Sequence, residues 1–139
     1  MGLIFVDSGV WIDNLRGRST PQTEVILRPR SARQRLVLGD LVLAEVLQGT
    51  RDETHLARVR SFFADLHPVV VCDHRVAVEA ARNYHRLRAL GITPRKTIDT
   101  LIATRCILDR IPLLYSDRDF DPFVQHLGLI SALDASGVN

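Results

Sequence analysis

The sequence of 139 residues contains few of the residues that build disulfide frameworks or zinc sites. Its two cysteines, Cys72 and Cys106, both lie in apolar runs and lack the spacing of metal ligands. We therefore expect two reduced thiols in the core of a cytoplasmic protein. The five histidines share no helical face and no ligand spacing, which argues against zinc.

Long hydrophobic runs are also absent. No apolar run approaches the roughly 20 residues that a membrane-spanning helix requires. The start of the chain reaches Asp7 without the basic region of a secretory signal. The sequence offers no glycine-rich phosphate loop and no clear Ser-His-Asp arrangement. These absences predict a soluble cytoplasmic protein without membrane contact.

Charge of one sign is not in excess, because 18 basic residues face 16 acidic ones and the net charge is +2. Lysine is nearly missing: Lys96 is the only one, and every other basic residue is an arginine. The arginines form two groups, which are Arg28, Arg30, Arg33 and Arg35, and Arg82, Arg86 and Arg88. Arginine pairs well with phosphate and stacks on bases. The groups indicate either a polyanionic partner or a general preference for arginine on solvated helix faces.

The length and the hydrophobic content of 46% predict a single domain over residues 1–139. Short apolar runs alternate with helical stretches along the chain. The predicted strands are Leu3–Val6, Arg35–Leu38, Pro68–Val71 and Pro112–Tyr115, with Leu129–Ala132 as a further candidate. Because these runs are continuous rather than alternating, they indicate strands buried on both faces. We therefore expect an α/β fold with a central parallel sheet flanked by helices.

The helical stretches carry their own boundary signals. The predicted helices are Ser8–Leu15, Pro21–Arg33, Leu41–Gln48, Glu53–Leu66, His74–Leu90, Ile98–Arg110 and Arg118–His126. Thr20-Pro21, Asp52 and Asp73 suit helix starts, while Gly17, Gly49, Gly91 and Gly128 suit helix ends. Pro29 should break or kink the second helix.

Four carboxylates, Asp7, Glu45, Asp99 and Asp117, lie inside or beside the apolar runs. A carboxylate beside a hydrophobic core is costly unless its charge is compensated. Since the same runs contain no lysine or arginine, we expect a divalent metal rather than a side chain to compensate it. Asp7 and Asp117 follow predicted strands and should meet at the carboxyl edge of the sheet. Asp99 would join them if its helix packs differently from a usual crossover.

Each acid also has an ordinary structural explanation. Glu45 could be a single exposed residue on a short helix, although it is the only charge between Asp40 and Arg51. Asp99 could stabilise a helix N-terminus, and Asp7 could end a strand in a turn, as could Asp117. Their joint occurrence favours another role, because metal-dependent phosphodiester hydrolysis needs several carboxylates to hold the ions that generate a hydroxide nucleophile.

Further polar residues surround the strand-end acids. Asp119 could extend the metal site, whereas Asp121 is expected on a solvated helix face or at a cap. Ser8 and Ser116 could support a carboxylate or a bound water through their hydroxyls. For Ser8, helix N-capping is an equal alternative.

Four segments together resemble the PIN-domain ribonucleases, and among them the VapC toxins of VapBC toxin–antitoxin pairs. The segments are Phe5–Asp13, Leu43–Gly49, Thr97–Ala103 and Leu113–Phe120. Spacings of 38, 54 and 18 residues separate their acids. The resemblance implies a Rossmann-like PIN fold and Mg²⁺- or Mn²⁺-dependent cleavage of RNA, often tRNA or rRNA. It also implies a homodimeric toxin, neutralised by a cognate VapB-type antitoxin that could insert a basic side chain among the acids.

The resemblance assigns roles to particular residues. Asp7, Glu45, Asp99 and Asp117 match the catalytic acidic quartet, with Asp7, Asp99 and Asp117 as metal ligands and Asp119 as an auxiliary acid. Trp11, Ile12 and Leu15 match the early helix that contributes to the antitoxin groove. Tyr115 departs from the pattern, since many relatives carry a small polar residue or histidine there.

Three other readings remain open. A non-catalytic PIN-like module would bind RNA or protein, and would be expected to lack one or more of the acids, whereas all are present. A receiver or a haloacid-dehalogenase-like phosphatase would need a late lysine or an Asp-x-Asp after the first strand, where this chain has Asp7-Ser8-Gly9. A Toprim-type site would leave Asp7 and Asp99 without a role.

Overall fold

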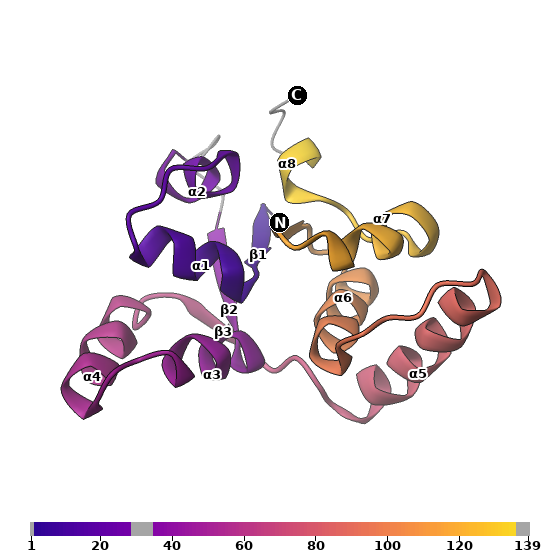
Figure 1. Ribbon diagram of the computed structural model, residues 1–139, viewed down its shortest axis with the longest axis horizontal. Helices are drawn as coiled ribbons and strands as arrows, with labels where there is room; N and C mark the ends of the chain where they lie inside the picture. The colour runs from indigo at the N-terminus through magenta and orange to yellow at the C-terminus, as the bar shows by residue number, and fades with distance from the viewer. Residues whose placement is uncertain (1, 29–34, 136–139) are drawn as a thin grey trace.

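The computed structural model describes residues 2–28 and 35–135, and a parallel sheet lies at its centre (Figure 1). The strand order in this sheet is β3-β2-β1-β4. The strands are β1 (Leu3–Val6), β2 (Arg35–Gly39), β3 (His67–Val69) and β4 (Leu113–Leu114). Every pairing is parallel, with β1 between β2 and β4. The predicted α/β fold with a central parallel sheet is confirmed.

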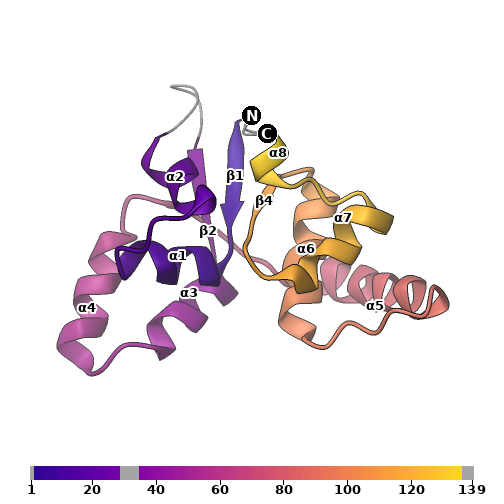
Figure 2. The ribbon, with the colours of Figure 1, turned by 45° about the horizontal axis from the view of Figure 1, so that its top comes forward.

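Helices flank this sheet in two groups (Figure 2). The first group is α1 (Ser8–Leu15), α2 (Pro21–Leu27), α3 (Asp40–Gln48) and α4 (Glu53–Phe62). The second group is α5 (His74–Ala89), α6 (Thr97–Asp109), the 3-10 turn η1 (Arg118–Phe120) and α7 (Asp121–Leu127), and the short α8 (Ala132–Ala135) follows. Figure 2 shows β1 between the two groups. Both faces of the sheet are therefore covered, as its continuous apolar strands require.

Local capping explains several helix boundaries. The Thr20 and Thr23 side chains form a reciprocal capping box at the start of α2, ahead of Pro21. The carboxylates of Asp52 and Asp73 accept hydrogen bonds from backbone amides in the first turns of α4 and α5. These three predicted helix starts are confirmed.

The core forms around β1, where Phe5 and Val6 are fully buried. Trp11 on α1 is also buried and meets Phe63 edge to face at a ring-centroid distance of 5.0 Å. Trp11 therefore belongs to the core and not to an exposed groove. On the other side, the buried Asn83 side chain of α5 donates to the Thr104 hydroxyl of α6 at 3.1 Å. That bond joins the long helix α5 to the helix that carries Asp99.

Arg105 fixes α6 further. Its side chain is only 11% exposed and bonds to the Val71 carbonyl and the Asp73 carboxylate. A guanidinium that is both paired and hydrogen-bonded can be held in one geometry. The segment between β3 and α5 is thereby tied to the middle of α6.

Some sequence expectations are wrong. Leu129–Ala132 is not a strand, because only Ser131 forms an isolated bridge, to Leu113, and Ala132 begins α8. The second helix ends at Leu27, and its expected continuation with Pro29 lies outside the described residues. Cys106 is buried as expected, but Cys72 is exposed, because β3 ends at Val69 and the chain leaves the sheet before Cys72.

Other boundaries shift by a few residues, and the predicted helix from Arg118 divides into η1 and α7. None of the helices in the described parts of the chain has the length and apolar character that crossing a membrane would take.

Gly39 is required by packing at the carboxyl end of β2. A Cβ atom placed there would overlap the Phe5 ring and lie 2.9 Å from Val71 Cγ2. Both neighbours are fully buried, so neither ring nor methyl group has free space to move into. The close approach of β2 to β1 therefore depends on the missing side chain.

We predict that Gly39→Ala lowers the free energy of unfolding by about 1–3 kcal/mol through overpacking. Urea denaturation followed by circular dichroism measures the change. Gly49→Ala is the matched control, because its Cβ would meet only the Val46 carbonyl at 3.4 Å. Equal stability of the two variants would contradict the packing role of Gly39.

Candidate metal centre

The acids reach one edge of the sheet through the direction of its strands. Asp7 follows β1 directly, and Asp117 follows β4 after a short connection. Asp99 lies in the first turn of α6. Helix α6 runs from this edge toward the opposite edge of the sheet. It ends at Arg110, whose φ of 56° lets the chain turn toward β4. An ordinary crossover therefore brings Asp99 to the site, and the expected need for unusual packing is wrong.

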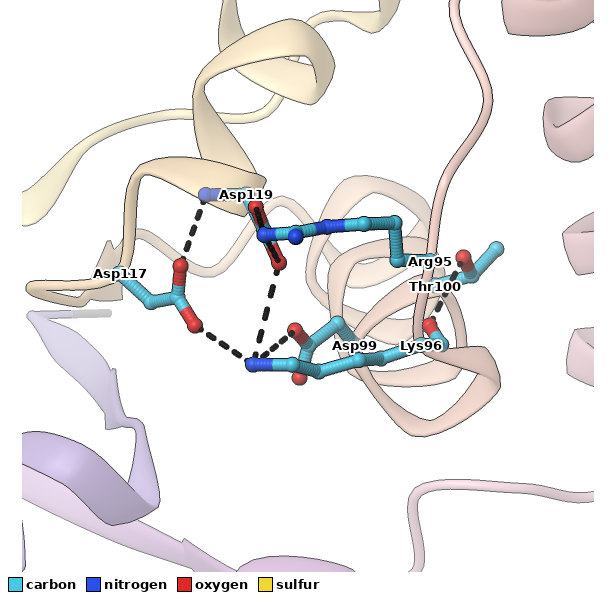
Figure 3. Close-up of polar contacts among 6 residues, drawn as sticks. All are labelled: Arg95, Lys96, Asp99, Thr100, Asp117 and Asp119. Carbon is cyan, nitrogen blue, oxygen red and sulfur yellow. Dashed lines mark hydrogen bonds and ion pairs between the residues drawn. The ribbon is translucent and has the colours of Figure 1, made fainter.

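Three carboxylates form the open part of the site (Figure 3). One oxygen from each of Asp99, Asp117 and Asp119 lies within 4.8 Å of the others. Their side chains are 12%, 39% and 24% exposed, respectively. The Asp117 and Asp119 side chains come from the end of the sheet, and Asp99 comes from a separate helix. Such a convergence concentrates negative charge where a solute can reach it.

Lys96, the only lysine of the chain, lies among these carboxylates (Figure 3). Its Nζ is 2.8 Å from Asp117 Oδ2, 3.8 Å from Asp119 Oδ2 and 3.9 Å from Asp99 Oδ2. These contacts raise the pKa of Lys96, chiefly through the hydrogen bond to Asp117. The expectation that no side chain compensates the four acids is therefore wrong for Asp99 and Asp117, whereas no such cation lies against Asp7 or Glu45 among the described residues. A lysine outside the apolar runs supplies a cation from the residue before α6.

Arg95 adds a second cation at the rim. Its guanidinium donates to both oxygens of Asp119, at 2.9 and 3.2 Å. Its side chain is 76% exposed, so this pair is more weakly held than a buried one. Sequence reasoning missed both Arg95 and Lys96. The sequence shows that both residues come just before the helix that carries Asp99. It does not show that they lie close to Asp117 and Asp119 in space.

Asp7 is the most deeply buried acid of the group. It is 6% exposed, and its Oδ1 has no hydrogen-bond partner. The pKa of Asp7 is raised to about 7, chiefly by burial and in part by the charges of Asp99 and Glu45, while the Ser8 amide opposes the shift. An ordinary strand-ending aspartate in a turn would be solvated, and Asp7 is not. Its protonation therefore depends on which charges surround it.

Asp99 is in a similar position but nearer to the surface. Burial raises its pKa to about 6, with Lys96 opposing the shift and Asp117 adding to it. Its Oδ2 has no hydrogen bond, because the ammonium of Lys96 is too distant to donate one. The backbone at the start of α6 is not capped by a side chain. Helix capping therefore does not account for this carboxylate.

Asp117 combines a structural contact with a contact inside the site. Its Oδ1 accepts from the Asp119 amide at 2.9 Å, which is the turn role expected of a strand-end aspartate. Its Oδ2 accepts from Lys96, and this bond is the main reason that the pKa of Asp117 is lowered. The predicted acids therefore differ sharply in their electrostatic surroundings.

Glu45 projects from α3, the helix that begins directly after β2. The residue is partly buried, and its Oε1 is enclosed without a hydrogen-bond partner. Its charge acts on both Asp7 and Asp99, since it raises the pKa of each. Glu45 is thus not the isolated exposed residue of the ordinary alternative. It does not contribute an oxygen to the cluster of Asp99, Asp117 and Asp119.

The polar residues beside the acids are tested only in part. The N-cap of α1 is Asp7, so the expected N-capping by Ser8 is wrong. Support of a carboxylate or a bound water by the Ser8 and Ser116 hydroxyls stays a prediction. Tyr115 donates to Asp121 at 2.8 Å, so its hydroxyl is occupied by that pair. Asp121, at the start of α7, serves this contact.

The donor set fits a divalent metal. Hard cations such as Mg²⁺ and Mn²⁺ prefer carboxylate oxygens and keep several water ligands. Enclosed carboxylate oxygens without partners remain on Asp7, Glu45 and Asp99. Buried polar atoms are normally satisfied, so these oxygens indicate a missing cation or water. Together with the cluster that includes Asp117 and Asp119, they provide anionic oxygens from several elements.

Comparisons with known proteins agree with this fold. The family model described as PIN domain matches residues 4–123. A chain in the crystal structure of VapBC2 from Rickettsia felis, bound to a DNA fragment from their promoter, is similar with a TM-score of 0.74 and 14% identity. The similarity covers 93% of this chain and 96% of that one.

Two further solved structures are similar. A chain of VapBC-1 from nontypeable Haemophilus influenzae has a TM-score of 0.73 and 15% identity, over 93% of this chain and 96% of that chain. A chain of FitAcB from Neisseria gonorrhoeae has a TM-score of 0.66 and 15% identity, over 92% and 95% of the two chains. At such identities, these structures show a shared fold.

We predict that the metal-free protein loses stability as the pH rises from about 4 to about 7. Asp7 binds a proton more tightly when folded, because its pKa is raised from 3.8 to about 7, and Asp99 shifts in the same direction to about 6. The folded state therefore holds more protons than the unfolded state in this range, and the free energy of unfolding falls with pH. The contribution of Asp7 is roughly 2–4 kcal/mol.

Urea unfolding at a series of pH values in EDTA measures this dependence. Asp7→Asn should flatten the decline, whereas Asp65→Asn, at an exposed position, should keep the wild-type slope. A decline of unchanged size in Asp7→Asn would show that Asp7 is not the titrating group.

Proposed function

The chain belongs to the PIN domain family, and from this premise we propose that it is a metal-dependent endoribonuclease and the toxin of a type II toxin–antitoxin pair. PIN domains are generally nucleases. The observation that carries the proposal is the convergence of Asp99, Asp117 and Asp119 beside the buried, unpartnered oxygen of Asp7. A folding role does not require these repelling carboxylates at one edge.

Asp7, Asp99 and Asp117 would hold the Mg²⁺ or Mn²⁺ ion, with Asp119 as an auxiliary acid. A divalent ion supplies Lewis acidity, which makes water a better nucleophile and offsets negative charge on a phosphate. Glu45 would add a further negative charge to the site, since its charge acts on both Asp7 and Asp99. Asp7 anchors the site, because its burial on β1 and α1 fixes the carboxylate in one place.

RNA is the proposed substrate, bound at least in part through its phosphate backbone, and tRNA or rRNA is the proposed target. Arg95 is well exposed at the rim of the acidic cluster, where it can pair with a phosphate next to the cleaved one. The arginines of α5 are partly engaged within the chain, since Arg82 and Arg86 both pair with Glu79. Arg88 donates to Thr93. Arg30 and Arg33 lie outside the described residues.

A VapB-type antitoxin is the proposed partner, and the active form is proposed to be a homodimer. Similar folds occur in VapBC complexes from two bacteria. Ile12 and Leu15 of α1 line a hollow of about 390 Å³ together with Val46 and Val59, and Leu15 is 39% exposed. An apolar segment of an antitoxin could fill this hollow.

We predict that the purified protein cleaves tRNA or rRNA with Mg²⁺ or Mn²⁺, and that EDTA abolishes the cleavage. Asp7→Asn and Asp99→Asn should each lower the rate at least about 100-fold, because each removes an anionic ligand from the site. Gel electrophoresis of total tRNA and rRNA measures the products.

Asp65→Asn is the matched control and should cleave like the wild type, since this carboxylate is exposed and precedes β3. Cleavage that persists in EDTA, or in both variants of the acidic site, would refute the metal-dependent nuclease. Absence of cleavage under every metal condition would favour the non-catalytic module.

We also predict that expression of the chain alone arrests growth, and that co-expression of a small DNA-binding protein encoded upstream relieves the arrest. Asp99→Asn should remove the toxicity but still co-purify with that protein. Leu15→Arg should weaken co-purification, because it removes an apolar contact and adds a positive charge to a hollow that Arg16 and Arg51 already line. Relief of toxicity without any association of the two chains would contradict an inhibitory complex.

A further inference from the structure

The ammonium group of Lys96 occupies the same carboxylates that a metal would use. Its Nζ lies 2.8 to 3.9 Å from oxygens of Asp117, Asp119 and Asp99 (Figure 3). One positive charge therefore faces three negative ones. No other lysine exists in the chain, and Arg95 bonds only to Asp119.

Two cations cannot use these oxygens together without a large electrostatic penalty. Metal–oxygen bonds of Mg²⁺ are about 2.1 Å long, so an ion bound by Asp99 and Asp117 would lie a few ångströms from the present position of Nζ. Like charges at that separation repel strongly, even with partial solvent screening. The ammonium in its present position therefore opposes binding of the metal.

The surroundings of Lys96 allow such a movement. Its side chain is 54% exposed, and the four-carbon stem has several rotatable bonds. Lys96 also borders a cavity of about 460 Å³ between α5 and α6, lined by Ala81, Tyr84 and Thr100 among others. The side chain of Lys96 thus has solvent and open space beside it.

We propose that Lys96 is an internal competitor of the metal: its ammonium neutralises the Asp99, Asp117 and Asp119 cluster in the metal-free protein and is displaced when the ion binds. This inference rests on the metal site of the proposed function and adds a control on its occupancy. Lys96 thereby lowers the metal affinity of the site and sets the concentration at which the nuclease becomes active. Lys96 does not bind the metal itself; it acts through the carboxylates for which the two cations compete.

The experiment measures Mn²⁺ binding directly, by isothermal titration calorimetry and by the electron paramagnetic resonance signal of free Mn²⁺. Lys96→Met removes the ammonium and keeps an apolar stem of similar shape. We expect its dissociation constant to fall at least about tenfold below that of the wild type. Lys96→Arg keeps the positive charge and should stay within about threefold of the wild type.

Arg58→Met is the control for a change in net charge, because Arg58 is exposed on α4, in the other group of helices. Its affinity for Mn²⁺ should match the wild type within about twofold. The rise in melting temperature on adding Mn²⁺ gives a second readout, which should be larger in Lys96→Met than in the other proteins. If Lys96→Met does not fold, Lys96→Gln replaces it.

The outcomes separate this inference from the proposed function. Mn²⁺ affinity in folded Lys96→Met that equals or falls below that of the wild type would overturn the competition while leaving the metal site intact. Failure of every protein, including Lys96→Met, to bind Mn²⁺ would overturn both. Binding by Lys96→Met alone would support the competition in its strongest form.

Discussion

Repulsion among carboxylates is the constraint on which this structure depends. The parallel sheet ends its strands at one edge, so Asp7 and Asp117 are delivered there by topology. The crossover through α6 adds Asp99. Nothing in hydrophobic packing requires acids at these positions. Burial raises the pKa of Asp7 and of Asp99, and the charges of the neighbouring acids add to both shifts. The fold therefore holds an electrostatically unfavourable arrangement that a bound cation would relieve.

Burial divides the acids into two classes with different demands. Asp7 is enclosed and pays a desolvation penalty when ionised, whereas Asp117 is stabilised as an anion by Lys96 and the Asp119 amide. A cation bound at both acids would favour ionisation of Asp7 and would compete with Lys96 for Asp117. The buried carboxylate of Asp7 is held rigidly, whereas the more exposed carboxylate of Asp117 can be reached from solvent.

The sequence predicted the parts of the site that depend on strand order. Continuous apolar runs located β1, and Asp7 followed from its end. The predicted helix Ile98–Arg110 placed Asp99 in its first turn, where it lies. Lys96 was not predicted to enter the site, because its pairing with Asp117 spans 21 residues and depends on how α6 packs. The burial of Glu45 Oε1 likewise depends on tertiary contacts of α3.

The errors have a common physical origin. Cys72 follows an apolar run but lies beyond the end of β3, so its hydrophobic neighbours do not bury it. Lys96 likewise lies outside the apolar runs that contain the acids, so its position in the sequence did not indicate that it pairs with them. Charge acts through space rather than along the chain, so a lysine just before α6 pairs with Asp117 and lies near Asp119, both at the η1 turn after β4. Compensation by a flexible, half-exposed side chain is reversible, so the pairing of Lys96 with these acids leaves them accessible to another cation.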